Sequence, residues 1–208
     1  MASVTRRTGA RGKAQRRSVE DNLERALARL VDGGASFTQL SVEALAAEAG
    51  IARATFYLHF RDKGELVAKL MQRVTEEITA AARLDAPETA TRDDLRATVA
   101  AVVALYRRHY AVMAAIVETA AYDPQVARLF QAMMRTLIEV NRKALVRRRA
   151  AGLVADDVPA LTPDVVTWAF ERACHQLIRV RRRAQVEALV EALTHIVWTA
   201  IYAPSPAA

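Results

Sequence analysis

The stretch from Ser41 to Lys63, SVEALAAEAGIARATFYLHFRDK, constrains the fold of this chain more than any other. Small and aliphatic residues recur with a helical period on both sides of Gly50. Ser41 is a favoured N-cap residue, and Gly50 permits the positive φ of a tight turn. Ile51 supplies an apolar side chain that can pack between the two segments. We therefore predict two short helices packed across a turn, which is a helix-turn-helix.

The rest of the chain also has helical periodicity, and no segment alternates in the way that a half-buried strand does. A helical period begins near Ser18, and capping residues mark further helix starts at Ser41, Asp62, Thr91, Asp123 and Thr162. Proline follows directly after two of these residues, as it often does at the first helical position. These signals predict an all-α protein with about nine helices.

Composition agrees with packed helices. Of the 208 residues, 52% are hydrophobic but only 6% are aromatic, and small residues of this kind favour helices over sheets. The single cysteine, Cys174, excludes an intramolecular disulfide framework and fits a reducing compartment. No uncharged apolar run approaches the ~20 residues of a membrane span, and the N-terminus lacks the apolar region of a secretory signal. We therefore expect a cytoplasmic protein with no membrane partner.

The net charge of +7 is concentrated at the N-terminus. Residues 1–20 carry six basic side chains and one carboxylate, whereas residues 21–73 are neutral overall. We expect residues 1–17 to form a disordered arm in isolation. Such a run is often only a solvated tail, but beside a helix-turn-helix we favour an arm that contacts DNA phosphates or the minor groove. Its cations are Arg6, Arg7, Arg11, Lys13, Arg16 and Arg17.

Two further basic clusters, residues 147–149 and 179–183, have acidic residues nearby in the sequence. We interpret both as solvated faces rather than as a second DNA site, with a charged effector or a membrane surface as the alternative partner. The chain has no glycine-rich phosphate loop, no Cys-x-x-Cys and no His-x-x-x-His, and its four histidines are far apart. We therefore expect no catalytic residues, no metal site, no cofactor and no enzyme activity, with Cys174 as a small buried residue.

Residues 23–66 resemble the DNA-binding domain of the TetR family of bacterial regulators. The tail, Leu193-Thr194-His195-Ile196 with Ile201-Tyr202, and the pair Glu171-Arg172 in the preceding helix are more weakly similar to the actinobacterial ethionamide-repressor subgroup. The first likeness rests on one helix face, the helix-turn-helix and a closing signature: Leu23, Ala26, Leu30, Gly34, Ser41, Val42, Leu45, Ala46, Ala49, Gly50, Ile51, Thr55, Phe56, Tyr57, His59, Phe60, Lys63 and Leu66.

The resemblance implies a three-helix DNA-binding domain at residues 18–66, followed by a larger helical effector-binding and dimerisation domain at residues 67–208. The base-facing turn of the recognition helix then holds Arg53, which suits guanine O6 and N7, with Ala54 and Thr55 suited to a thymine methyl group. The sequence departs from the family at Ala52, where Ser or Thr usually caps this helix, and at Ala54, which is often Gly. The phosphate contacts implied by the resemblance are Ser41, Tyr57, His59 and Lys63.

The resemblance also implies a homodimer through the last two helices, at residues 162–180 and 184–202. Such a dimer places two recognition helices about one DNA turn apart and predicts a palindromic operator. A small hydrophobic or amphipathic effector would release the repressor from that operator. Asn141 and Thr167 need hydrogen-bond partners if they face inward. The implied effector positions are Tyr106, Met134, Leu137, Asn141, Thr167 and Phe170.

Two alternatives remain at this point. One is a ligand-independent DNA-binding dimer, acting as a constitutive repressor or an architectural protein. The other is a helical enzyme or binding protein whose motif has decayed, against which the intact signature from Thr55 to Lys63 argues.

Overall fold

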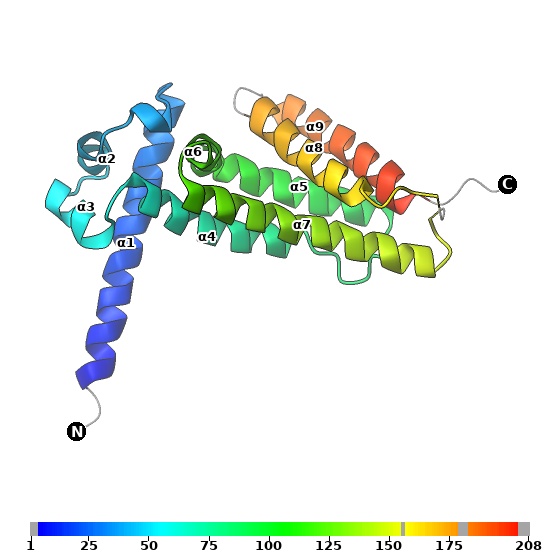
Figure 1. Cartoon of the computed structure of the whole chain (residues 1–208), viewed down its shortest axis with the longest axis horizontal. Helices are drawn as coiled ribbons and strands as arrows, with labels where there is room; N and C mark the ends of the chain where they lie inside the picture. The colour runs from blue at the N-terminus through cyan, green and yellow to red at the C-terminus, as the bar shows by residue number, and fades with distance from the viewer. Residues whose placement is uncertain (1–3, 155–156, 179–182, 204–208) are drawn as a thin grey trace. The chain divides into compact units, whose positions relative to one another are not determined.

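The computed structural model describes residues 4–154, 157–178 and 183–203, with side chains from Arg17 onward except Arg183. Within these ranges all regular structure is helical, which confirms the all-α prediction (Figure 1). The helices are α1 (Val4–Asp32), α2 (Val42–Glu48), α3 (Arg53–His59), α4 (Lys63–Ala81), α5 (Arg92–Arg108), α6 (Tyr110–Ala120), α7 (Pro124–Ala150), α8 (Thr162–Leu177) and α9 (Arg183–Val197), with the short 3₁₀ helix η1 (Phe37–Gln39) and a π-helical turn, η2 (Trp198–Tyr202).

The helices form two compact units. The N-terminal unit comprises Met1–Arg73 and Ala111–Leu129, and so includes α1 to α3, the start of α4, and α6. The C-terminal unit comprises Val74–Tyr110 and Phe130–Ala208. The expected division after residue 66 therefore differs from the structure, because α6 is grouped with the N-terminal helices. Sequence order hides this grouping, since α5 comes between α4 and α6 in the chain.

α1 begins at Val4, ahead of the expected start near Ser18. The predicted disordered arm at residues 1–17 thus differs from the helical backbone that the structure has from residue 4. The sequence offers a partial reason, because the segment has no proline and is rich in Arg, which favours helix, although Gly9 and Gly12 oppose it. Arg17 is exposed. The side chains of Arg6, Arg7, Arg11, Lys13 and Arg16 lie outside the described set.

Capping residues begin the helices largely as predicted. The Ser41 hydroxyl accepts the Ala44 N–H at 3.0 Å, and Thr91 forms a reciprocal capping box with Asp94. The Thr162 prediction was wrong, because Thr162 is itself the first residue of α8 and its N-cap, Leu161, makes no side-chain bond. Pro163 alone was therefore a sufficient signal for this helix start.

The core of the N-terminal unit consists of aromatic and aliphatic side chains from four helices and η1. Fully or nearly fully buried are Leu23, Leu27, Phe37, Leu45, Phe56, Phe60 and Leu66. Arg73 of α4 pairs with both Asp21 and Glu24 of α1. This ion-pair cluster fixes α4 against α1 at the edge of the core.

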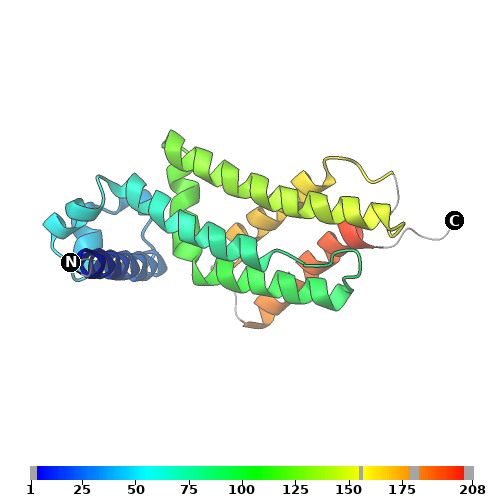
Figure 2. The same ribbon diagram turned by 90° about the horizontal axis from the view of Figure 1, so that it is seen from below.

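The C-terminal unit packs α9 along α5 and beside α8 (Figures 1 and 2). No single helix in the described part of the chain is both long and apolar enough to cross a membrane. α5 and α6 would meet that length and composition only when taken together, across a sharp bend.

Arg148 of α7 is only 4% exposed, which corrects the prediction that residues 147–149 form one solvated face. Its guanidinium donates to the carbonyl oxygens of Pro87 at 2.7 Å and Tyr202 at 2.6 Å, and lies over the Trp198 ring at 5.6 Å. Burial lowers the pKa of Arg148. Consecutive helical residues are rotated by about 100°, so Arg148 points inward while Arg147 points outward. The cluster at 179–183 lies outside the described side chains.

Arg148→Ala should lower the free energy of unfolding by about 2–4 kcal/mol, because it leaves two carbonyl groups without their donor in a buried region. Arg147→Ala is the matched control, since its side chain is 56% exposed and its contacts are long. That change should stay within about 0.5 kcal/mol. Urea denaturation followed by circular dichroism measures both. Equal effects of the two substitutions would contradict the inward role of Arg148.

Candidate nucleic-acid interface

The helix-turn-helix is formed by α2 and α3 around Gly50 (Figure 1). Gly50 has φ +67°, a value that side-chain-bearing residues rarely adopt. Its N–H and that of Ile51 donate to the carbonyls of Ala47 at 3.1 Å and Ala46 at 3.0 Å, which closes the end of α2. The predicted motif is confirmed. The turn directs α3 away from α2 and leaves one side of α3 facing solvent.

α3 buries Phe56 and exposes the opposite face, which carries Arg53, Ala54, Tyr57 and Leu58. Leu58 is 82% exposed. An exposed leucine beside Arg53 can contact a thymine methyl group but cannot read a polar base edge. Leu58 was missed in the sequence analysis. Its spacing of four residues from Ala54 could have revealed it, because that spacing places both on one face.

Arg53 is held at this surface by two neighbours. Its Nη1 lies 2.7 Å from Glu43 Oε1 of α2, and its guanidinium lies 5.5 Å from the centre of the Tyr57 ring. The Tyr57 hydroxyl and the charge of Glu43 raise the pKa of Arg53 above its ordinary value. Backbone hydrogen bonding, with a smaller contribution from Arg53, lowers the pKa of Glu43. Because all of these groups are exposed, water screens the pair and a phosphate or base can compete with Glu43.

The other phosphate candidates have different surroundings. Ser41 is exposed, and its hydroxyl serves as the N-cap of α2. His59 is half-buried, with its ring 6.2 Å from that of Phe60. α3 has no side-chain cap at Ala52, in line with the departure from the family pattern there. Ser41, Tyr57 and His59 therefore stay candidates at the surface of the motif.

Lys63 points inward instead. Its ammonium donates to the carbonyl oxygens of Phe37 at 3.2 Å, Thr38 at 3.1 Å and Leu40 at 2.5 Å. It also lies 5.1 Å from the centre of the Phe37 ring. Burial lowers the pKa of Lys63, while the charge of Glu118 acts in the opposite direction. An ammonium has three protons, so in this arrangement all of them are used within the protein.

Glu118 of α6 holds the other end of η1. Its Oε2 accepts the Ser36 hydroxyl at 2.9 Å and the Thr38 N–H at 3.1 Å. Together, Lys63 and Glu118 fix the segment that leads from α1 into α2, and we call this pair the η1 clamp. Sequence reasoning missed Glu118 altogether, because eighty residues separate it from Thr38.

The predicted effector positions lie in the C-terminal unit, where the polar ones are paired. Asn141 donates to the Thr167 hydroxyl at 2.9 Å, so these two polar groups are partners of each other. The Tyr106 hydroxyl donates at 3.1 Å to Glu171, and burial raises the pKa of Tyr106. Met134 is buried, while Leu137 and Phe170 are half-buried.

Glu171 was not among the predicted residues. It is 5% exposed, and its Oε2 has no hydrogen-bond partner in the described part of the structure. Thr167 and Glu171 are one helical turn apart on α8 and thus share a face. An apolar interior with one buried carboxylate suits a ligand that carries a hydrogen-bond donor.

Cys174 is fully buried, and burial raises the pKa of its thiol, as expected for a small core residue. Within the described ranges no three His, Cys, Asp or Glu side chains gather as potential metal ligands.

Two protein-family models match the sequence of this chain. Residues 32–70 match the bacterial regulatory proteins of the tetR family, and residues 95–203 match the C-terminal domain of the transcriptional regulator EthR. The second match spans more than half of the chain. The chain belongs to the TetR family. The sequence likeness to this family and to its EthR-type C-terminal domain is therefore confirmed, and the α2–α3 pair is the DNA-binding element of a TetR-family regulator.

Solved structures share the fold at low sequence identity. PfmR, a TetR-family regulator from Thermus thermophilus, is 18% identical and has a TM-score of 0.69, over 89% of this chain and 99% of that one. A TetR-like regulator from Rhodococcus sp. RHA1 is 21% identical, with a TM-score of 0.63 over 86% and 93%. FadR from Bacillus subtilis, solved with stearoyl-CoA, is 14% identical, with a TM-score of 0.68 over 86% and 98%. No curated protein sequence matches the chain significantly.

Lys63→Ala should lower the free energy of unfolding by about 1–3 kcal/mol, because three carbonyl groups lose a charged donor. The salt dependence of DNA binding should stay unchanged. Lys69→Ala, in the same helix, is the control for stability. Urea denaturation measures the change in stability, and titrations of DNA binding at several salt concentrations measure the salt dependence. A salt slope reduced by about one, with unchanged stability, would instead assign Lys63 to a phosphate.

Proposed function

We propose that this TetR-family regulator is a homodimeric repressor that binds a palindromic operator and is released by a small hydrophobic or amphipathic effector. The observation that carries the proposal is the exposed face of α3, where Arg53 lies beside small and apolar residues. A guanidinium next to methyl-bearing side chains suits a major-groove edge that offers a guanine and a thymine.

The proposed DNA contacts divide into two kinds. Arg53 reads a guanine, while Ala54, Thr55 and Leu58 meet thymine methyl groups. Phosphates are contacted by Ser41, Tyr57 and His59, and the basic arm adds sequence-independent attraction that weakens with salt. For Lys63, its contacts with η1 support a positioning role in place of the phosphate contact expected from the sequence.

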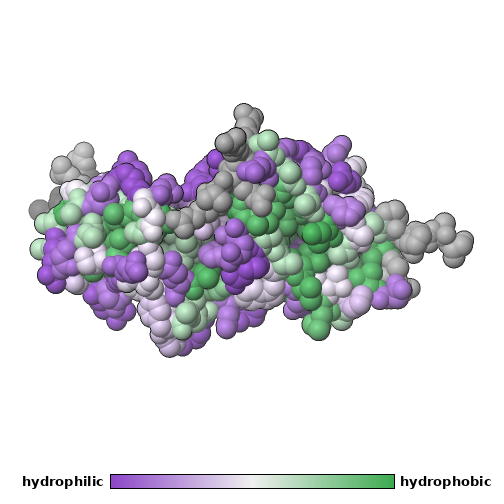
Figure 3. All heavy atoms as spheres, turned by 90° about the horizontal axis from the view of Figure 1, so that it is seen from above, coloured by the Kyte–Doolittle hydropathy of each residue, from purple (hydrophilic) through white to green (hydrophobic). Residues whose placement is uncertain are grey.

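The proposed dimer surface lies on α8 and α9. Leu161, Val165 and Trp168 recur at helical spacing and are 68%, 64% and 41% exposed, and Ile196 of α9 is 48% exposed. Figure 3 shows apolar side chains gathered on the side where α8 and α9 lie. A second copy related by a two-fold axis would cover both faces at once. The two recognition helices would then lie about 34–36 Å apart, one DNA turn.

The proposed effector site lies among α5, α7 and α8. The Asn141–Thr167 and Tyr106–Glu171 pairs supply its polar groups, in apolar surroundings that include Met134. FadR from Bacillus subtilis was solved with stearoyl-CoA, which is an amphipathic molecule. We infer a ligand of similar character here. It would lower operator affinity by the difference in its binding energy between the free and DNA-bound forms.

The deciding experiment is selection of bound DNA from random duplexes with the full chain, followed by mobility-shift titrations of the selected site with stearoyl-CoA and palmitate. We expect a palindromic site and weaker binding when one ligand is present. A palindrome that no ligand affects would favour a ligand-independent repressor. Failure to select any duplex would overturn the proposal.

Arg53→Ala should weaken binding to the selected operator by tenfold or more, because one good base contact is worth about 1–3 kcal/mol of discrimination. Binding to random duplex should fall much less, since phosphate contacts remain. Arg107→Ala removes an exposed arginine from α5 and serves as the control. Fluorescence anisotropy with both duplexes measures the ratio of the affinity for the operator to the affinity for random duplex. An equal loss on both duplexes would contradict base recognition by Arg53.

Val165→Glu should convert the dimer to monomers at micromolar concentration, because it buries a charge in the proposed interface. Val146→Glu is a matched control, since Val146 is a similarly exposed valine of α7, at 58%. Sedimentation velocity should show a dimer for the wild type and for this control. A dimeric Val165→Glu variant would place the interface elsewhere.

A further inference from the structure

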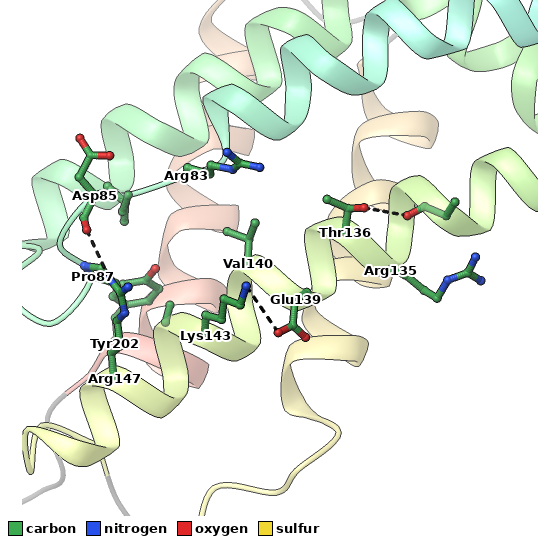
Figure 4. Close-up of a pocket in the computed structure, with 13 residues that line it drawn as sticks. Arg83, Asp85, Pro87, Arg135, Thr136, Glu139, Val140, Lys143, Arg147 and Tyr202 are labelled. Atoms are coloured by element: carbon green, nitrogen blue, oxygen red, sulfur yellow. Dashed lines mark hydrogen bonds and ion pairs between the residues drawn. The ribbon is translucent and has the colours of Figure 1, made fainter.

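A groove of about 780 Å³ opens between the loop that follows α4, helix α7 and Tyr202 of η2 (Figure 4). All of its lining residues belong to the C-terminal unit. Its volume lies within the range of small-molecule sites in proteins. The groove is therefore large enough for a ligand of several carbon atoms.

This groove is separate from the proposed effector site. Met134, Leu137 and Asn141 lie on one face of α7, whereas the groove is lined by Thr136, Val140 and Lys143. At 100° per residue, the two sets are rotated by about 120° around the helix. A ligand in the groove would thus contact a different surface of α7 from the effector.

Positive charge dominates the groove. Four cations line it, Arg83, Arg135, Lys143 and Arg147, against the two carboxylates Asp85 and Glu139. The Glu139 carboxylate is engaged by Arg142 at 3.2 Å and lies 3.9 Å from Lys143. In Figure 4 the Asp85 carboxylate points away from the centre of the groove. The carboxylates therefore leave most of the positive charge uncompensated.

Arg83 is exposed and available to a ligand. Its side chain makes no ion pair among the described residues, whereas Arg147 approaches Glu88 at 3.9 Å and the Asp85 carbonyl at 3.4 Å. Figure 4 shows Arg83 and Lys143 on either side of Val140. Two cations flanking an apolar side chain form a suitable site for a single anionic head group.

The remaining lining is apolar. Leu84, Pro87 and Val140 supply hydrocarbon surface, and Tyr202 lies at one end. Burial raises the pKa of Tyr202 to about 12, so its hydroxyl is neutral at physiological pH. Arg148 holds the backbone carbonyl of Tyr202 and so keeps this end in place.

We propose that this groove binds an amphipathic organic anion, with its carboxylate or phosphate head between Arg83 and Lys143 and its hydrocarbon part on Leu84, Pro87 and Val140. Charge-assisted hydrogen bonds fix the head, and removal of the chain from water adds apolar burial energy. This is a second ligand site, independent of the effector site and of DNA binding.

Isothermal titration calorimetry on the full chain tests the site with octanoate, octyl phosphate, octanol and inorganic phosphate. We expect at least one amphipathic anion to bind at least tenfold more tightly than octanol or inorganic phosphate. The two anions distinguish a carboxylate site from a phosphate site. Affinity should fall with added salt, because the attraction is electrostatic and partly exposed.

Arg83→Glu should reduce the affinity for the preferred anion by tenfold or more, since it replaces attraction with repulsion. Arg128→Glu, on α7 but outside the groove, should leave it unchanged. Thr167→Val should also leave it unchanged, because that residue belongs to the effector site. Circular dichroism confirms that each variant folds.

Any of four results would overturn the proposal. Octanol could bind as tightly as the anions, folded Arg83→Glu could bind the anion with unchanged affinity, or Thr167→Val alone could lose binding. The fourth is inorganic phosphate that binds as tightly as octyl phosphate, which would make the groove a simple anion site and refute the amphipathic ligand. None of these outcomes depends on operator binding, so they are distinguishable from a failure of the proposed repressor function.

Discussion

The placement of the recognition helix depends on the ammonium group of Lys63. This ammonium donates to backbone carbonyl oxygens of the η1 segment, and Glu118 accepts the Thr38 N–H from the same segment. These hydrogen bonds fix the path of the chain from α1 to α2. α2 in turn carries Glu43, which holds Arg53 on the surface of α3. A carbonyl oxygen left unmet in this partly buried segment would cost about 1–3 kcal/mol. The position of α3 therefore depends on contacts within the protein that lie away from its exposed face.

Glu118 also explains why α6 is grouped with the N-terminal helices although it follows α5 directly in the chain. Its carboxylate accepts a hydrogen bond from Ser36, just before η1. Asp123 follows the end of α6, and a Cβ atom at position 64 of α4 would lie only 2.6 Å from its Oδ2. Glycine at position 64 thus allows α4 to approach the start of α7 closely. Through Glu118, α6 is in direct contact with the connection that leads from α1 to α2.

The sequence predicted those features whose physical cause lies within a few residues. Ser41 caps α2 through an N–H three residues away, and Gly50 adopts a positive φ because of the turn in which it lies. Family resemblance located α3 as the recognition helix. Neither source could orient Lys63 or find Glu118, because their partners are between 23 and 82 residues away. Helical spacing alone could have placed Leu58 on the same face as Ala54. Its exposure to solvent, however, depends on the burial of Phe56 on the opposite face.

The basic residues show why net charge describes this protein poorly. Arg53 is exposed and paired with a carboxylate, so DNA can compete for it in water. Lys63 and Arg148 are instead bound by backbone carbonyls, which satisfy hydrogen bonds without neutralising charge. Arg148 therefore supports the fold, because it holds the backbone of Tyr202, a residue that lines the groove. The surroundings of each cation, rather than the number of cations, decide whether it binds DNA, supports the fold or attracts an anion.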